Sequence, residues 1–205
     1  MRAFVNVYYR LLMYASGPAS EKILRLPQLT RPRGRRSVPA MSDLSKQFIS
    51  DSRAFLTQDY MPKIERCLTQ LTKGQVWSRS NDHSNSIGNL LLHLAGSSRY
   101  WAVEVIGGEP IGRVRQAEFD RREPASPEQL MADLRAAVKE VDRKLAEIPG
   151  EALLEMRTTR EEKLTVLWCV YHIVEHFAMH TGQILSMTKA LVGELSKDLG
   201  PSVAK

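Results

Sequence analysis

The last quarter of the chain contains the run Tyr171-His172-Ile173-Val174-Glu175-His176-Phe177-Ala178-Met179-His180-Thr181-Gly182-Gln183-Ile184. Three of the five histidines in the protein fall within it, four residues apart. An α-helix completes a turn in about 3.6 residues, so this interval places the three rings along one stripe of a helix. The residues between them are largely apolar, which indicates a helix packed in a protein interior. The run therefore predicts a buried helix that carries imidazoles along one side.

Helical periodicity continues through most of the chain after residue 41. We expect four main helices, at about 43–71, 86–106, 126–148 and 165–192. Pro62 falls inside the first and is expected to kink or divide it, because proline lacks the backbone N–H that an interior helical residue donates. Four helices of about twenty residues joined by loops are typical of a bundle. The sequence predicts an all-α fold, a four-helix bundle.

The segments between these helices carry start and stop signals. Ser126 is a good N-cap, and Gln129 is placed to complete a capping box with it. Gly107-Gly108 is expected to end the second helix. We expect a polar loop at 108–125 and, as the only strand signal, a short extended segment around 155–159.

Charge divides the chain at about residue 41. The protein has 29 basic and 23 acidic residues, a formal net charge of +6, and residues 1–40 hold eight of the basic residues and one acidic residue. Residues 41–205 therefore carry 21 basic and 22 acidic residues and are nearly neutral. We interpret 1–40 as a basic, poorly packed leader or as an extension upstream of a true start at Met41, and 41–205 as the bundle. An acid-poor, arginine-bearing leader also resembles an organelle transit peptide, which is the less favoured interpretation. The near-neutral bundle argues against a nucleic-acid partner.

Cysteine content and hydropathy indicate the cellular setting. Cys67 and Cys169 are far apart and do not form a disulfide scaffold, so we expect a reducing compartment, the cytoplasm. We find no run of about 18 uncharged apolar residues, so no membrane span is expected.

The histidines predict a metal site. Neighbouring rings on the last helix are about 6 Å apart along its axis and can hold one ion, whereas His172 and His180 are about 12 Å apart and cannot. Spacing leaves both His172/His176 and His176/His180 open, with His93 of the second helix as the natural third ligand. Three protein nitrogens leave a position for water or substrate, as in catalytic sites.

Two alternatives to this site are open. The histidines can be hydrogen-bonded core or surface residues without a metal. His172-Ile173-Val174-Glu175-His176 also matches the H-x-x-E-H pattern of inverzincin metalloproteases, although a motif this short arises easily by chance.

Two stretches together resemble the DinB/YfiT-like superfamily of metal-dependent four-helix proteins, in particular its small bacterial DinB-like branch. They are Asn85-Ser86-Ile87-Gly88-Asn89-Leu90-Leu91-Leu92-His93-Leu94-Ala95-Gly96, with Arg99 and Trp101 after it, and His172 to Ile184. The resemblance covers roughly 41–195. It implies His93, His176 and His180 as metal ligands, with His172 a neighbour, and it implies a homodimer. Relatives are similar to bacillithiol-type thiol transferases and mycothiol-dependent isomerases, which implies a small thiol as cofactor or substrate.

We therefore expect a cytoplasmic enzyme that holds a divalent ion, Zn²⁺ or Ni²⁺, on His93, His176 and His180. Its open coordination position would activate water or a small thiol, for hydrolysis or S-transfer to a small-molecule substrate. The alternative is a non-catalytic dimeric helical bundle with a structural metal or none.

Overall fold

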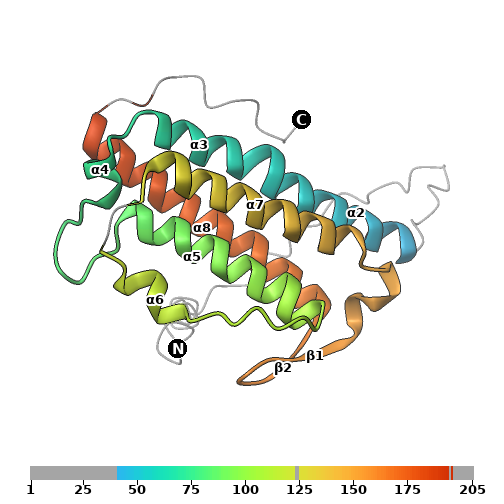
Figure 1. Ribbon diagram of the computed structural model, residues 1–205. Helices are drawn as coiled ribbons and strands as arrows, with labels where there is room; N and C mark the ends of the chain where they lie inside the picture. Colours follow the sequence, from blue (N-terminus) through green and yellow to red (C-terminus); the bar gives the residue numbers. More distant parts are fainter. Residues whose placement is uncertain (1–40, 123–124, 194, 196–205) are drawn as a thin grey trace, which may run out of the picture. The chain divides into compact units, whose positions relative to one another are not determined.

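The computed structural model describes residues 41–122, 125–193 and 195; the expected leader, 1–40, lies outside them. Four long helical segments of the described chain lie side by side (Figure 1). They are α2 with η1 and α3 (Met41–Ala54, Phe55–Tyr60, Met61–Thr69), α5 with η2 (Ile87–Arg99, Tyr100–Ile106), α7 (Pro127–Ala146) and α8 (Val166–Val192). The predicted all-α four-helix bundle is confirmed.

Short elements connect the long helices. They are α4 (Lys73–Trp77), α6 (Arg115–Asp120), η3 (Gly150–Leu154), β1 (Met156–Thr158) and β2 (Lys163–Thr165). The two strands form an antiparallel hairpin in which Arg157 pairs with Leu164. The strand expected around 155–159 is therefore present, and the hairpin leads directly into α8 (Figure 1).

The first long helix passes through Pro62 without breaking. The segment η1, immediately before α3, is π-helical, and Pro62 lies in the first turn of α3. A proline leaves one carbonyl of the preceding turn without its usual donor. A π-helical turn changes the hydrogen-bonding partner by one residue and is a common adjustment at such points. The predicted disturbance at Pro62 thus takes the form of a local widening of the helix.

Serine caps set the starts of the second and third helices. Ser126 accepts a hydrogen bond from the backbone N–H of Gln129, as expected, but the Gln129 side chain donates to Asp133 and does not complete a capping box. Complete capping boxes lie instead at the starts of α4, between Thr72 and Gln75, and of α5, between Ser86 and Asn89. At the other end of this helix, a Cβ on Gly107 would come within 2.7 Å of the Val103 carbonyl oxygen, so only glycine fits the stop.

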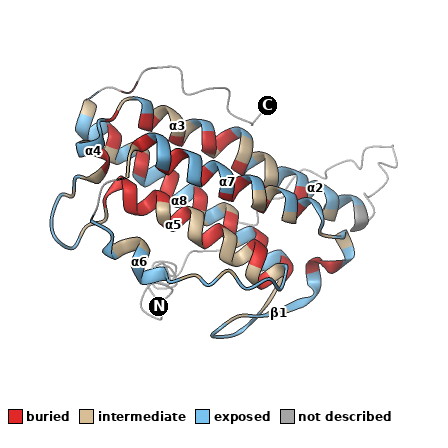
Figure 2. Cartoon of the chain, viewed as in Figure 1, coloured by how far each residue is buried: buried red, intermediate tan, exposed pale blue. Residues whose placement is uncertain are grey.

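Apolar side chains of the four helices meet in one core. Figure 2 shows buried residues on each of the four long helices. Leu56, Leu91, Leu134 and Phe177 come from different helices and are almost completely buried. Burial of each such side chain stabilises the fold by about 1.5–3 kcal/mol. The core therefore fixes α5 beside α8, and these two helices carry the candidate site.

Among the described helices, none combines the length and the apolar character needed to cross a bilayer.

Candidate metal centre

Three imidazoles from two helices meet at one point of the bundle. His93 of α5 has its Nε2 atom 3.0 Å from the Nε2 atom of His176 on α8. The Nε2 atom of His180, one turn further along α8, lies 3.1 Å from the same His176 atom. The candidate ligand atoms of the three residues all lie within 4.8 Å of one another. His93 and His180 are buried, with 5% and 8% of their surface exposed.

The outer nitrogens of two of these rings are already hydrogen-bonded. The Nδ1 atom of His93 lies 2.9 Å from Oε2 of Glu118, and the Nδ1 atom of His180 lies 2.6 Å from Oε1 of Gln183. A carboxylate and an amide oxygen only accept hydrogen bonds, so each Nδ1 carries the proton. The Nε2 atoms of His93 and His180 therefore present lone pairs toward His176.

This arrangement of lone pairs suits a cation. The Nε2 atom of His176 can carry at most one proton, so hydrogen bonding among the three rings satisfies at most one of the two lone pairs that face it. Three converging neutral imidazole nitrogens are, in contrast, a common donor set for a divalent transition metal. The three histidines thus form a group that could bind a divalent ion.

Burial favours the neutral form of the two rings on α8, which is the form that binds a metal. Burial is the largest cause of a pKa of about 2 for His176, and the neighbouring His180, His93, His172 and Arg113 contribute to the same lowering. Burial also lowers the pKa of His180, although the hydrogen bond to Gln183 opposes this. At neutral pH the lone pairs are therefore available without the loss of a proton.

The lowered pKa of His176 predicts that the metal-free protein is destabilised by acid. An unfolded histidine takes up a proton near pH 6.5, whereas folded His176 does so only near pH 2. Its contribution to stability is therefore complete above about pH 6.5 and is lost progressively below it, by roughly 2 kcal/mol at pH 5. Urea unfolding in the presence of a chelator, at pH 7 and pH 5, measures this difference. The free energy of unfolding of the variant His176→Gln should depend less on pH. An unchanged pH dependence would show that His176 is not the source of the acid sensitivity.

The segment expected to be a polar loop contributes to the site. It contains the short helix α6, which packs against α5 (Figure 1). Besides Glu118 it supplies Phe119, whose ring lies 4.7 Å from the His93 ring, and the preceding Arg113, which pairs with Glu118 at 2.6 Å. Burial acts to raise the pKa of Glu118, but the hydrogen bonds from Arg113 and His93 outweigh it and lower that pKa. No spacing rule links these residues to His93, so their place at the site could not be predicted from the sequence.

Comparison with known proteins places this geometry in a family. A sequence model of the mycothiol S-transferase family matches residues 52–187, which include all three histidines and most of the four long helices. The chain belongs to the mycothiol S-transferase family. This family is DinB/YfiT-like, so the resemblance seen in the sequence is confirmed. A search of curated proteins found no match.

His172 lies next to this group but not in it. Its ring stacks on Trp168 at 4.9 Å and meets the edge of Trp101 at 5.0 Å. Its Nδ1 atom is 2.9 Å from Oε1 of Glu175. The structure therefore gathers the His176/His180 pair with His93, and Glu175 of the H-x-x-E-H pattern is exposed and directed to His172.

One exposed aromatic residue and one buried thiol lie near the histidines. Trp168 is 38% exposed, so it forms part of a wall beside the histidines and is not a core residue as its type would suggest. Its neighbour Cys169 is buried outside the histidine group, and burial raises the pKa of its thiol to about 11. In this mycothiol S-transferase family member the thiol of Cys169 is consequently protonated at neutral pH.

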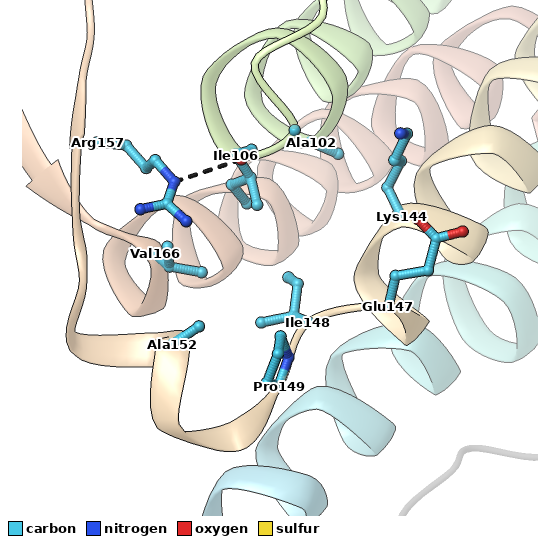
Figure 3. Close-up of a pocket in the computed structure, with 10 residues that line it drawn as sticks. Ala102, Ile106, Lys144, Glu147, Ile148, Pro149, Ala152, Arg157 and Val166 are labelled. Carbon is cyan, nitrogen blue, oxygen red and sulfur yellow. Dashed lines mark hydrogen bonds between the residues drawn. The ribbon is translucent and has the colours of Figure 1, made fainter.

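A separate cavity of about 220 Å³ opens near the far end of α5 and η2 (Figure 3). Ala102 and Val166 line it; each is about ten residues from the nearest site histidine, or about 15 Å along its helix. The cations in it are already paired, Lys144 with Glu109 and Arg157 with Glu155. No histidine lines this cavity, and it is distinct from the candidate metal centre.

Proposed function

We propose that the protein is a metal-dependent thiol S-transferase in which His93, His176 and His180 hold one divalent ion. The observation that carries the proposal is the convergence of the three Nε2 atoms, at 3.0 and 3.1 Å, while the Nδ1 atoms of His93 and His180 are engaged elsewhere. Membership of the mycothiol S-transferase family supports a thiol substrate. The non-catalytic alternative has no comparable support.

The donor set indicates the kind of ion. Neutral imidazoles suit Zn²⁺ and Ni²⁺, and we propose one of these two. Such an ion, when bound, supplies Lewis acidity that lowers the pKa of a thiol. Three protein ligands leave room for this additional partner.

The two carboxylates that contact histidines at or beside the site are already engaged in hydrogen bonds. Glu118 is occupied by Arg113 and His93, and Glu175 is occupied by His172. We infer that the thiol proton leaves to solvent. The thiol sulfur then forms a bond to an electrophilic carbon of a second small molecule, and the leaving group departs with the electron pair of the bond that breaks. Trp168 and Trp101 form the wall beside which this second molecule would lie.

We predict that the purified protein, loaded with Zn²⁺ or Ni²⁺, accelerates the reaction of a small sugar-linked cysteinyl thiol with a chlorodinitrobenzene. The rate should exceed the metal-free rate by roughly 10²-fold or more, since enzymes generally provide far larger accelerations. Absorbance of the thioether product measures it. A chelator should abolish the acceleration, and added metal should restore it. S-transfer would be refuted if the metal-loaded protein gave no rate above that of buffer alone with any thiol of a panel. Ester hydrolysis is the parallel assay for a hydrolase.

We also propose that the protein is a cytoplasmic homodimer. Supporting the dimer, α8 exposes a group of large apolar side chains: Leu167, Trp168, Tyr171 and Met179. Exposed apolar patches of this kind commonly mark contacts between proteins. A solution mass equal to that of one chain, measured by light scattering, would refute the dimer.

A further inference from the structure

The best-supported role beyond the three histidines belongs to Glu118. We propose that Glu118, together with the space that Gly96 leaves for its carboxylate, positions the His93 imidazole for metal binding. This inference rests on the proposed metal centre. It assigns no contact with the ion to Glu118, which acts on the ion only through His93.

The Glu118 carboxylate is fixed on both oxygens. Arg113 donates from Nε to Oε1 at 2.6 Å and from Nη2 to Oε2 at 2.8 Å. The oxygen Oε2 also accepts from Nδ1 of His93 at 2.9 Å, a shorter contact than the 3.3 Å between this Nδ1 and Nη2 of Arg113. A bidentate guanidinium–carboxylate pair holds its geometry more rigidly than a single hydrogen bond. The hydrogen bond from His93 therefore meets an acceptor whose position is fixed.

Gly96 makes this position of the carboxylate possible. A Cβ atom at Gly96 would lie 2.1 Å from Oε1 of Glu118 and 2.9 Å from its Cδ atom, with Nε of Arg113 at 3.1 Å. A glycine inside a helix costs about 1 kcal/mol relative to alanine. Gly96 therefore lowers the stability of the helix α5. The carboxylate of Glu118, which packs against it, gives a physical reason for a glycine at this position. Gly182 of α8 is a contrasting case, since among the described residues no atom outside its own stretch of helix backbone lies within 4 Å of its Cβ position.

The backbone around Glu118 is anchored to α5 one turn before His93. The side-chain amide of Asn89 donates to the carbonyl of Glu118 at 2.8 Å and to that of Arg121 at 3.2 Å. Arg79 adds a hydrogen bond to the carbonyl of Phe119 at 3.2 Å. The segment that carries Glu118 is thus held on the same helix as the ligand it orients.

These contacts set three properties of His93. They place its proton on Nδ1, they fix the ring orientation, and the carboxylate raises the electron density of the ring. Residues that hydrogen-bond a metal-binding histidine in this way typically contribute 10–100-fold to metal affinity, about as much as we expect here. Without Glu118, the ring would be free to rotate its lone pair away from His176 and His180.

Metal titration of the full chain and its variants tests the proposal. Zn²⁺ affinity is measured against a chelating dye, and the visible absorption of bound Co²⁺ reports the ligand geometry. Glu118→Ala and Gly96→Ala should each weaken binding about 10–100-fold and alter the Co²⁺ spectrum. Glu118→Gln should restore part of the affinity, because its amide oxygen still accepts from Nδ1. The double variant should be no weaker than the weaker single variant, because both changes remove the same contact.

Gly182→Ala is the matched control for Gly96→Ala. Both variants replace a helical glycine near a site histidine, but only Gly96→Ala displaces Glu118. Equal weakening by the two changes, or parent-like affinity in Glu118→Ala, would overturn the positioning role while the metal centre stands. A parent protein that binds neither ion would overturn both proposals. Unfolding curves of the metal-free variants verify that the affinity changes do not reflect loss of the fold.

Discussion

His176→Ala should leave the purified protein with almost no bound divalent ion, whereas His172→Ala should retain about one ion per chain. His176 is the central ring of the group, with its Nε2 atom 3.0 and 3.1 Å from those of His93 and His180. Its removal takes away one ligand and separates the other two. The loss in affinity should exceed the 10–100-fold typical of residues that only support a ligand. His93→Ala and His180→Ala should behave like His176→Ala.

His172→Ala is the matched control because His172 lies on the same helix, one turn from His176. Its ring is occupied by Trp168 and Glu175 and takes no part in the group. Elemental analysis after dialysis against metal-free buffer measures the ion content of each variant. Equal content in all of them would refute the ligand assignment. Retention of metal by His180→Ala together with its loss from His172→Ala would instead favour the His172/His176 pair that spacing alone allows.

The periodicity of the sequence was enough to predict the four long helices and a stripe of histidines along the last of them. Helical spacing is a local property, and the interval of four residues between histidines determines which rings share a face. It did not choose between two adjacent pairs on α8, because that depends on how far along its neighbour α5 places His93. This register is set by core packing, which involves residues such as Leu91 and Phe177 on different helices. The resemblance to a family supplied what spacing could not.

The contribution of α6 was not predictable for a related reason. Glu118 and Phe119 reach His93 across 25 and 26 positions of sequence, through a segment whose composition indicates a polar loop. Its position depends on hydrogen bonds from Asn89 and Arg79 to backbone carbonyls, and any residue offers a carbonyl.

Replacement of Asn89 by alanine should destabilise the protein by roughly 2–4 kcal/mol. Asn89 is completely buried and joins α5 to the segment that carries α6. Its side-chain oxygen accepts from the backbone N–H and the hydroxyl of Ser86, at 3.2 and 2.6 Å, and its amide donates to three carbonyls that include that of Glu118. The carbonyls of Phe119 and Arg121 would keep hydrogen bonds from Arg79 and Arg122. The Ser86 backbone N–H and the Glu118 carbonyl would lose the partner that Asn89 gives them, and each buried group left unsatisfied costs about 1–3 kcal/mol. Some of them would regain water when the segment detaches, which limits the total.

Urea unfolding of the metal-free protein measures this loss, and hydrogen exchange of the amides in α6 shows whether the segment detaches. Asn81→Ala is the matched control, because Asn81 is exposed and its side chain accepts only from the backbone of His83 at 3.0 Å among the contacts the structure gives it. Exposed substitutions usually change stability by about 0.5 kcal/mol or less. Detachment of α6 also removes Glu118 from His93, so Zn²⁺ affinity should fall with stability in Asn89→Ala and not in Asn81→Ala. Similar stability of the two variants would show that the contacts of Asn89 do not hold α6, and the orientation of His93 would then depend on Arg113 and the space at Gly96 alone.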